Sequence, residues 1–324
     1  MRKVKNYQND APLRLKLERI AIHYAGFAVR KLIAPIYSRF VEHPNYKPGI
    51  SANILTKNDV WLREALISIK DYVDEFVIID SSNEIYYNRN LRLLEELNLK
   101  NVKHVRKETD IYNARVLSHS LSEYSWILHW DGDMVAFDSG DNNLSHLINI
   151  VKELINKRVY YEIFFPLVIT GSRVDRVSIQ GYQVEAWLYT NSPKFKWVLK
   201  KLGKGGEAYI ERARFPLFYR KMYLDIPYAL HLKFLFPIDK LVLKKVQYKW
   251  MNPDVREKYS NFEEFLQEQK SRLNVDDLIT DDGDLDELKN GKLPKILEPY
   301  RKIELPDLIN MKNRLDGVLS EEQH

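Results

Sequence analysis

Short apolar runs alternate with amphipathic segments from residue 50 to residue 166. The apolar runs are rich in the β-branched and aromatic residues that favour strands, and they cover 50–56, 75–80, 101–105, 126–130 and 160–166. In the segments between them, apolar residues recur at helical spacing, over 57–72, 89–98, 111–123 and 143–157. This alternation predicts βαβ units, and therefore an α/β fold with a mostly parallel central sheet and flanking helices.

The first amphipathic segment has a clear helical face. Its apolar positions are Trp61, Leu62, Ala65, Leu66 and Ile69. Asn58 or Asp59 precedes them, and either side chain can accept a hydrogen bond from a free backbone N–H at the start of a helix. We therefore expect one of the two to be the N-cap.

Two aspartates stand where neighbouring predicted strands stop. Asp80 is the last residue of the 75–80 run, and Asp131 directly follows the 126–130 run. Sheets of this kind bind ligands at the carboxyl ends of their strands. We therefore expect Asp80 and Asp131 to belong to one binding site.

Asp131 also begins an Asp-Gly-Asp tripeptide, which occurs a second time at 282–284. Apolar residues on both sides of 131–133 predict a partly buried loop, and two buried carboxylates repel each other unless a cation or hydrogen-bond donors compensate. Mg²⁺ or Mn²⁺ can supply that charge. The 282–284 copy lies among other acidic residues and lacks the spacing of a calcium loop, so we expect a solvated acidic turn there.

Composition and charge narrow the function classes. The chain has no cysteine, which excludes disulfides, thiolate zinc sites and cysteine nucleophiles. No run approaches the roughly 20 apolar residues needed to span a bilayer, and the basic N-terminus is not followed by the apolar core of a secretory signal. We therefore expect a cytoplasmic protein, with or without peripheral contact to a membrane.

Charge is distributed unevenly along the chain. Residues 1–48 hold ten Lys and Arg against three acidic residues, residues 194–249 hold fourteen against four, and residues 253–324 hold eleven against eighteen. The basic regions indicate an anionic partner or an exposed, solvated surface. Residues 13–32 form a basic amphipathic pattern, which fits either a helix packed on the main domain or one lying on an anionic membrane.

These changes in charge and in residue pattern along the chain predict three parts. They are an N-terminal helical arm (1–48), an α/β domain (49–250) with halves at about 49–135 and 136–250, and an acidic helical extension (251–324). We expect the α/β domain to be the catalytic domain.

The order of motifs over roughly residues 50–135 resembles the family 2 glycosyltransferases of the GT-A fold. The resemblance rests on NILTKNDVWLREALISIKDYVDEFVIIDSSN, on the helix opening Asn113-Ala114-Arg115, and on WILHWDGD. It implies that the first strand and its loop border a nucleotide, with Thr56 and Asn58 among the binding residues. It also implies that Asp80 contacts the base and that Arg115 lies beside the nucleotide.

In the same family the Asp-X-Asp motif holds a metal that bridges the diphosphate. The resemblance therefore implies that Asp131 and Asp133 bind Mn²⁺ or Mg²⁺, with Asp131 also beside the nucleotide. The expected activity is a metal-dependent, inverting transfer of a sugar from a nucleotide-diphosphate sugar to a glycan, lipid-linked or protein acceptor.

Inversion also needs a carboxylate that takes the proton of the acceptor hydroxyl. The downstream candidates are Asp175, Glu185, Glu207 and Asp225. Glu207 ranks first because it follows Gly205-Gly206, as a glutamate in related enzymes follows a glycine-bearing acceptor loop, and Glu185 ranks second.

Four downstream residues have two interpretations each. His231 lies in an apolar run and is either a core histidine or a late metal or diphosphate ligand, since imidazole suits Mn²⁺. Lys204, Arg212 and Arg214 either bind phosphate oxygens or are solvated surface residues.

Two other functions compete with the transferase. A sugar nucleotidyltransferase shares the sheet and the metal carboxylates, but its first loop is usually glycine-rich, and ILTKND has no glycine. A non-catalytic module binding an anionic polymer or nucleic acid would use the basic regions, but the sequence has none of the standard signatures. We therefore expect no nucleic-acid partner.

Overall fold

The computed structural model describes residues 32, 34, 36, 40–41, 44–157, 159–202, 208–237, 240–241, 246, 249–272, 281–287 and 292–315. The predicted helix at 13–32 lies outside this part of the chain, apart from Leu32. Among the residues that the structure describes, none lies in a helix with the length and apolar character of a membrane span.

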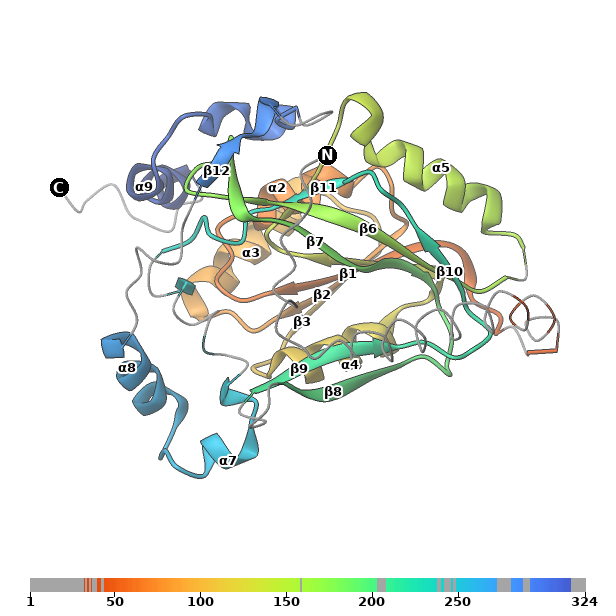
Figure 1. Ribbon diagram of the computed structural model, residues 1–324, viewed down its shortest axis with the longest axis horizontal. Coiled ribbons are helices and arrows are strands. Elements are labelled where there is room, and N and C mark those ends of the chain that lie inside the picture. The colour runs from red at the N-terminus through yellow and green to blue at the C-terminus, as the bar shows by residue number, and fades with distance from the viewer. Residues whose placement is uncertain are drawn as a thin grey trace, which may run out of the picture.

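Four parallel strands form one half of the central sheet (Figure 1). They are β1 (Lys47–Thr56), β2 (Glu75–Asp80), β3 (Val102–Arg106) and β4 (Tyr124–Asp131), in the order β3-β2-β1-β4. The helices α2 (Leu62–Ile69), α3 (Glu84–Leu97) and α4 (Ile111–Leu121) connect them. Thr56 is in register with Asp80, and Leu55 with Asp131, so the strands end at one edge of the sheet.

The second half of the sheet contains the antiparallel pairs. The order continues from β4 through β7 (Arg176–Thr190), β6 (Tyr161–Thr170) and β11 (Ala229–His231) to β5 (Met134–Ala136). β10 (Arg220–Tyr223) pairs with β6, β12 (Asp281–Asp284) pairs with β7, and α5 (Leu144–Leu154) follows β5 in the chain. β7 is antiparallel to β4 and β6, whereas β10 and β11 are parallel to β6. The expected α/β architecture, with a mostly parallel sheet flanked by helices, is confirmed.

A separate hairpin covers α4. Its strands β8 (Lys196–Leu202) and β9 (Ala208–Arg214) form a two-stranded sheet that lies beside α4 (Figure 1). Phe195, Trp197 and Phe215 pack with Tyr189 of β7 in an aromatic cluster under the hairpin. This aromatic packing fixes the hairpin on the same side of the sheet as α4.

The C-terminal elements are α7 (Pro253–Arg256), α8 (Phe262–Arg272) and α9 (Leu305–Leu315), with short 3-10 turns at Leu285–Glu287 and Lys295–Tyr300. α9 is anchored to α2 by the fully buried Lys312, whose ammonium group lies 2.7 Å from Glu64. Tyr300 donates a hydrogen bond of 2.8 Å to the same carboxylate. A buried charge needs such a partner, so this contact holds the end of the chain against the sheet domain.

Two local predictions are wrong. Helix α2 begins after Trp61 and has no side-chain cap, because Asn58 adopts a left-handed conformation (φ 53°) and Asp59 accepts a hydrogen bond from the N–H of Lys57 instead. The second Asp-Gly-Asp is part of strand β12 and not a turn, because its backbone pairs with β7.

Candidate functional site

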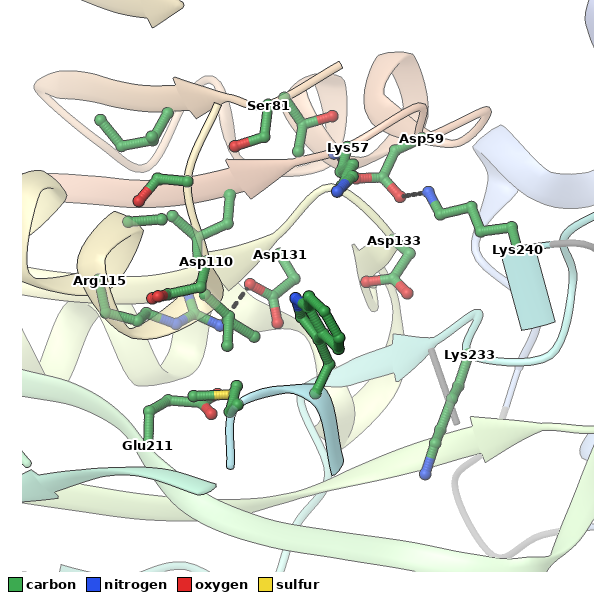
Figure 2. Close-up of a pocket in the computed structure, with 18 of the residues that line it drawn as sticks. Lys57, Asp59, Ser81, Asp110, Arg115, Asp131, Asp133, Glu211, Lys233 and Lys240 are labelled. Atoms are coloured by element: carbon green, nitrogen blue, oxygen red, sulfur yellow. Dashed lines mark hydrogen bonds and ion pairs between the residues drawn. The ribbon is translucent and has the colours of Figure 1, made fainter. Parts of the chain in front are cut away.

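A cavity of about 510 Å³ opens where β1, β2 and β4 end. Its wall includes both aspartates of 131–133, together with residues from α4, β7, β9, the loop after β11 and α7. Figure 2 shows Asp131 and Asp133 facing the same space, with Lys57 and Asp59 on one side and Glu211 on the other. The fold therefore places the Asp-Gly-Asp motif at the end of β4 in the wall of a cavity.

Asp131 is held by an arginine from α4. The Nη2 atom of Arg115 donates a hydrogen bond of 2.7 Å to its Oδ1 atom, and the arginine side chain is almost completely buried. Asp110 caps the helix that carries this arginine by accepting a hydrogen bond from the N–H of Asn113. This ion pair places a positive and a negative charge together at the cavity wall, whereas the position of Arg115 beside a nucleotide stays a prediction.

Asp133 faces His231. Strand β11 pairs with β5 so that His231 is in register with Met134, and the N–H of Leu232 donates to the carbonyl of Asp133. The Nε2 atom of His231 lies 3.4 Å from Oδ2 of Asp133, which is longer than a strong hydrogen bond. His231 thus belongs to the cavity as well as to the sheet, although it is about 98 residues distant in the chain from Asp133.

Gly132 allows a third carboxylate to approach the motif. A Cβ atom on this residue would lie 2.8 Å from Oδ2 of Asp59. Asp59 forms an ion pair with Lys240, whose ammonium group also donates to the carbonyl of Asn58. Both Asp59 and Lys240 line the cavity, and sequence reasoning assigned neither to the site.

The predicted nucleotide-binding residues of β1 lie in different positions. Thr56 lines the cavity, is buried, and its hydroxyl has no hydrogen-bond partner among the described residues. Asn58 connects two loops: its N–H donates to Ser82 and its side chain accepts from the N–H of Asn83. Thr56 therefore forms part of the cavity wall with its hydroxyl buried, whereas the described contacts of Asn58 are internal.

Asp80 lies beneath the cavity. It is fully buried, and its carboxylate accepts hydrogen bonds from the N–H of Ser82, from Asn90 and from the ring of His104. Burial would raise the pKa of Asp80, but the hydrogen bonds from His104, Asn90 and Ser82 together hold it below its usual value. These contacts shape the loop that presents Ser81 to the cavity. Base contact by Asp80 itself stays a prediction.

The predicted base candidates are not all near the cavity. Glu207 and Lys204 lie outside the described residues, and for Glu185 the backbone lies in β7 between Gln183 and Trp187, which both line the cavity. Asp175 forms an ion pair with Arg173, and Asp225 is exposed. Neither of these two is among the described residues that line the cavity.

Glu211 is a carboxylate of the cavity wall that sequence reasoning missed. It lies on β9, four residues beyond Glu207, while its neighbours Arg212 and Arg214 are exposed. The sequence does contain a hint, because Glu211 is the one acidic residue of the basic strand β9. Its neighbours Arg212 and Arg214 alternate with it, so their exposure places Glu211 on the inner face.

Residues from the C-terminal part close one side of the cavity. They are Trp250, Met251, Arg256 and Phe262. The Nη2 atom of Arg256 lies 3.7 Å from Oδ2 of Asp110. The same guanidinium group lies over the Trp250 ring, 5.9 Å from its centroid. This contact joins α7 to the start of α4 across the cavity, a role that the acidic composition of 251–324 did not suggest.

Two histidines behind the cavity are held neutral by burial. Burial lowers the pKa of His119 to about 4, and burial and the nearby Arg115 charge lower the pKa of His129 well below its usual value. The ring of His129 lies 5.1 Å from Trp187 and 5.5 Å from Trp197 in edge-on contacts. The wall behind Arg115 is therefore aromatic and carries no second positive charge from these histidines at neutral pH.

The donor set suits one divalent ion with few protein ligands. Among the described residues, no group of three or more His, Asp and Glu side chains is arranged to hold a metal. Asp133 and His231 face each other, and the buried Nδ1 atom of His231 has no hydrogen-bond partner within that part of the chain. One carboxylate and one imidazole suit Mn²⁺ bound together with substrate phosphates.

Comparisons with known proteins give distant structural likenesses. No protein-family model and no curated protein sequence matches the chain. S. aureus TarS 1–349 is similar at 15% identity and a TM-score of 0.36, covering 61% of this chain and 65% of that one, and a longer TarS chain is covered over only 39%. The inositol-1-phosphate CTP transferase from T. maritima is similar at 13% identity and a TM-score of 0.30, covering 46% of this chain and 73% of that one. At these values the likenesses do not define an activity.

Proposed function

We propose that the protein is a glycosyltransferase that takes a sugar from a nucleotide-diphosphate donor, depends on Mn²⁺ or Mg²⁺, and inverts the anomeric centre. The observation that supports it most is the convergence of Asp131, Asp133, Arg115 and His231 on one cavity at the carboxyl ends of the strands. Open α/β sheets bind nucleotides at this position.

The nucleotide half of the cavity offers matching groups for a donor. The side chain of Ser81 can bind the nucleoside, and Lys57 and Arg115 are close enough to the same space to attract the diphosphate (Figure 2). Arg115 also keeps Asp131 oriented through its 2.7 Å hydrogen bond. These contacts would hold the donor with its sugar directed toward the opposite wall.

Asp133 and His231, with Asp131, are the residues that would hold the metal. A bound divalent cation stabilises the negative charge that grows on a departing diphosphate. The buried position of Asp133 makes that charge compensation stronger than it would be in water, since the local dielectric is low.

Thermal unfolding with a panel of UDP- and GDP-sugars, with and without Mn²⁺, tests this function. We expect one donor to raise the melting temperature only when metal is present, and Asp131→Ala and Asp133→Ala to abolish the shift. Asp284→Ala is the matched control and should behave as the wild type. Equal shifts in all variants would contradict the proposal, and release of pyrophosphate from a nucleoside triphosphate would instead indicate a nucleotidyltransferase.

A further inference from the structure

A transfer with inversion needs a base, and the cavity wall contains few carboxylates that could act as one. The described acidic residues of the wall are Asp59, Glu108, Asp110, Asp131, Asp133 and Glu211. A base must lie beside the acceptor, on the face of the sugar opposite the diphosphate, and it must be able to accept a proton there.

Five of these carboxylates lie in the loops at the strand ends or in the Asp-Gly-Asp motif itself. Asp59 is paired with Lys240, and Asp110 caps α4. Asp131 is paired with Arg115, and Asp133 faces His231. Glu108 is exposed on the loop between β3 and α4, on the nucleotide side.

Glu211 comes from the opposite side of the cavity. It lies on β9 in register with Leu199, two residues before Ala213, which is in register with Trp197. Alternate residues share one face of a strand, so Glu211 is on the face of Ala213, about 7 Å farther along. Since the Trp197 ring lies 5.8 Å from the guanidinium group of Arg115, this face of the hairpin is turned toward the Arg115–Asp131 pair.

The exposure of β9 supports the same orientation. Arg212 and Arg214 are exposed, whereas the Oε2 atom of Glu211 is buried. Figure 2 shows the Glu211 side chain directed into the cavity from the wall across from Lys57 and Ser81. The inner face of the hairpin therefore presents the Glu211 carboxylate to the cavity from this wall.

We propose that Glu211 is the catalytic base, an inference that rests on the function proposed above. Its carboxylate takes the proton of the acceptor hydroxyl while the acceptor oxygen forms a bond to the anomeric carbon. The bond from that carbon to the diphosphate breaks, and its electron pair leaves with the nucleoside diphosphate. The acceptor therefore enters between the hairpin and the sugar, on the side of the cavity that β9 lines.

Glu211→Gln tests this role, because it keeps the shape of the side chain and removes its basicity. The substrate is the UDP- or GDP-sugar that stabilises the wild type most, and the assay follows its hydrolysis, with water in place of the acceptor. We expect kcat to fall about 10²–10⁴-fold. Calorimetric titration with the matching nucleoside diphosphate and Mn²⁺ should give a Kd within about twofold of the wild type.

Three further variants make the result specific. Glu211→Asp should recover part of the lost kcat, and the acidic limb of the pH–rate profile should disappear in Glu211→Gln. Glu263→Gln, at an exposed position of α8, is the matched control and should keep full activity. Glu185→Gln should retain most of the activity.

The outcomes separate this role from the function itself. If the wild type turns over and Glu211→Gln is also active, the assignment of Glu211 is wrong and the transferase function stands. The same conclusion follows if Glu185→Gln is inactive but still binds nucleotide. A wild type that neither binds nor hydrolyses any donor would remove the proposed function, and this role with it.

Discussion

Asp131-Gly132-Asp133 and Asp282-Gly283-Asp284 have the same residues but different surroundings in the fold. The first begins at the last residue of β4, at the edge where the parallel strands end, and its side chains meet Arg115 and His231 inside a cavity. The second is an edge strand along β7, where Asp284 pairs with the partly exposed Arg176 at 2.6 Å. The partners of a short acidic motif are therefore determined by the strands around it, and the same three residues have different contacts in the two places.

The glycines of the two copies differ in the same way. Gly132 has the Asp59 carboxylate against it, whereas the nearest atom to a Cβ on Gly283 is a flexible Glu287 oxygen at 3.7 Å. Gly283 has instead a backbone conformation, φ 159°, that disfavours other residues. The first glycine is required by packing at the site and the second by the path of the chain.

The largest expected difference between the copies is in turnover. Asp133→Asn should lower donor hydrolysis on the order of 10²–10³-fold, because it removes a charge at the proposed position of the metal and diphosphate. Asp284→Asn should leave the rate unchanged. Steady-state hydrolysis of the preferred nucleotide-sugar measures both, and equal losses in the two variants would contradict the distinction.

Lowering the pH should reduce the folding stability of the protein through His119, which is buried near the first Asp-Gly-Asp copy. His119 has a pKa of about 4 in the folded protein and near 6.5 when unfolded, so its contribution to stability is complete above pH 6.5 and is lost as pH falls toward 4. The difference corresponds to about 3 kcal/mol at most. Urea unfolding at pH 7 and pH 5 should show a smaller loss for His119→Gln than for the wild type, and the same loss in both would contradict this origin.

His129 should act in the same direction, since its pKa is also lowered by burial. A window between pH 6.5 and 5 isolates the histidines, because carboxylates such as Asp80, whose pKa is already low, titrate below it.

Gly132→Ala should destabilise the fold by about 1–3 kcal/mol, since the added methyl group meets the Asp59 side chain. In an Asp59→Ala background this cost should shrink. The cost of Gly283→Ala should not depend on Asp59, because that cost comes from the backbone. Chemical denaturation of the two double-mutant cycles measures the coupling, and its absence at Gly132 would mean that the loop relaxes.

The smallest effect concerns the ion pair of the second copy. Asp284→Asn should lower stability by less than about 1 kcal/mol, because both partners are partly exposed to water. Thermal unfolding at low and high salt is the check, and a loss of several kcal/mol would show that β12 is more important to the fold than its exposure indicates.

The first half of the fold was predictable because its signals are local. Strand 75–80 and the helix around Arg115 follow from the apolar pattern, and the register of β1 with β2 and β4 then brings the strand ends together. Most residues that were named from sequence and line the cavity belong to this half or directly follow it: Thr56, Arg115, Asp131 and Asp133. His231, on β11, is the exception among them.

The rest of the site depends on contacts between distant segments. Lys240 reaches Asp59 across about 180 residues, and Glu211 depends on how a hairpin packs on α4. Periodicity cannot reveal such contacts, since they are set by the pairing of β7 with β4 and by the aromatic cluster under β8 and β9. For the same reason the edge strand β12 was mistaken for a turn.

Direct measurement of metal binding tests the central claim, that only the first Asp-Gly-Asp has a metal and nucleotide role. Electron paramagnetic resonance of Mn²⁺ in the presence of the preferred nucleoside diphosphate reports the free ion in the wild type, Asp133→Asn and Asp284→Asn. We predict one tightly held Mn²⁺ in the wild type and in Asp284→Asn, and its loss in Asp133→Asn. Retention of the ion by Asp133→Asn together with its loss in Asp284→Asn would contradict the account.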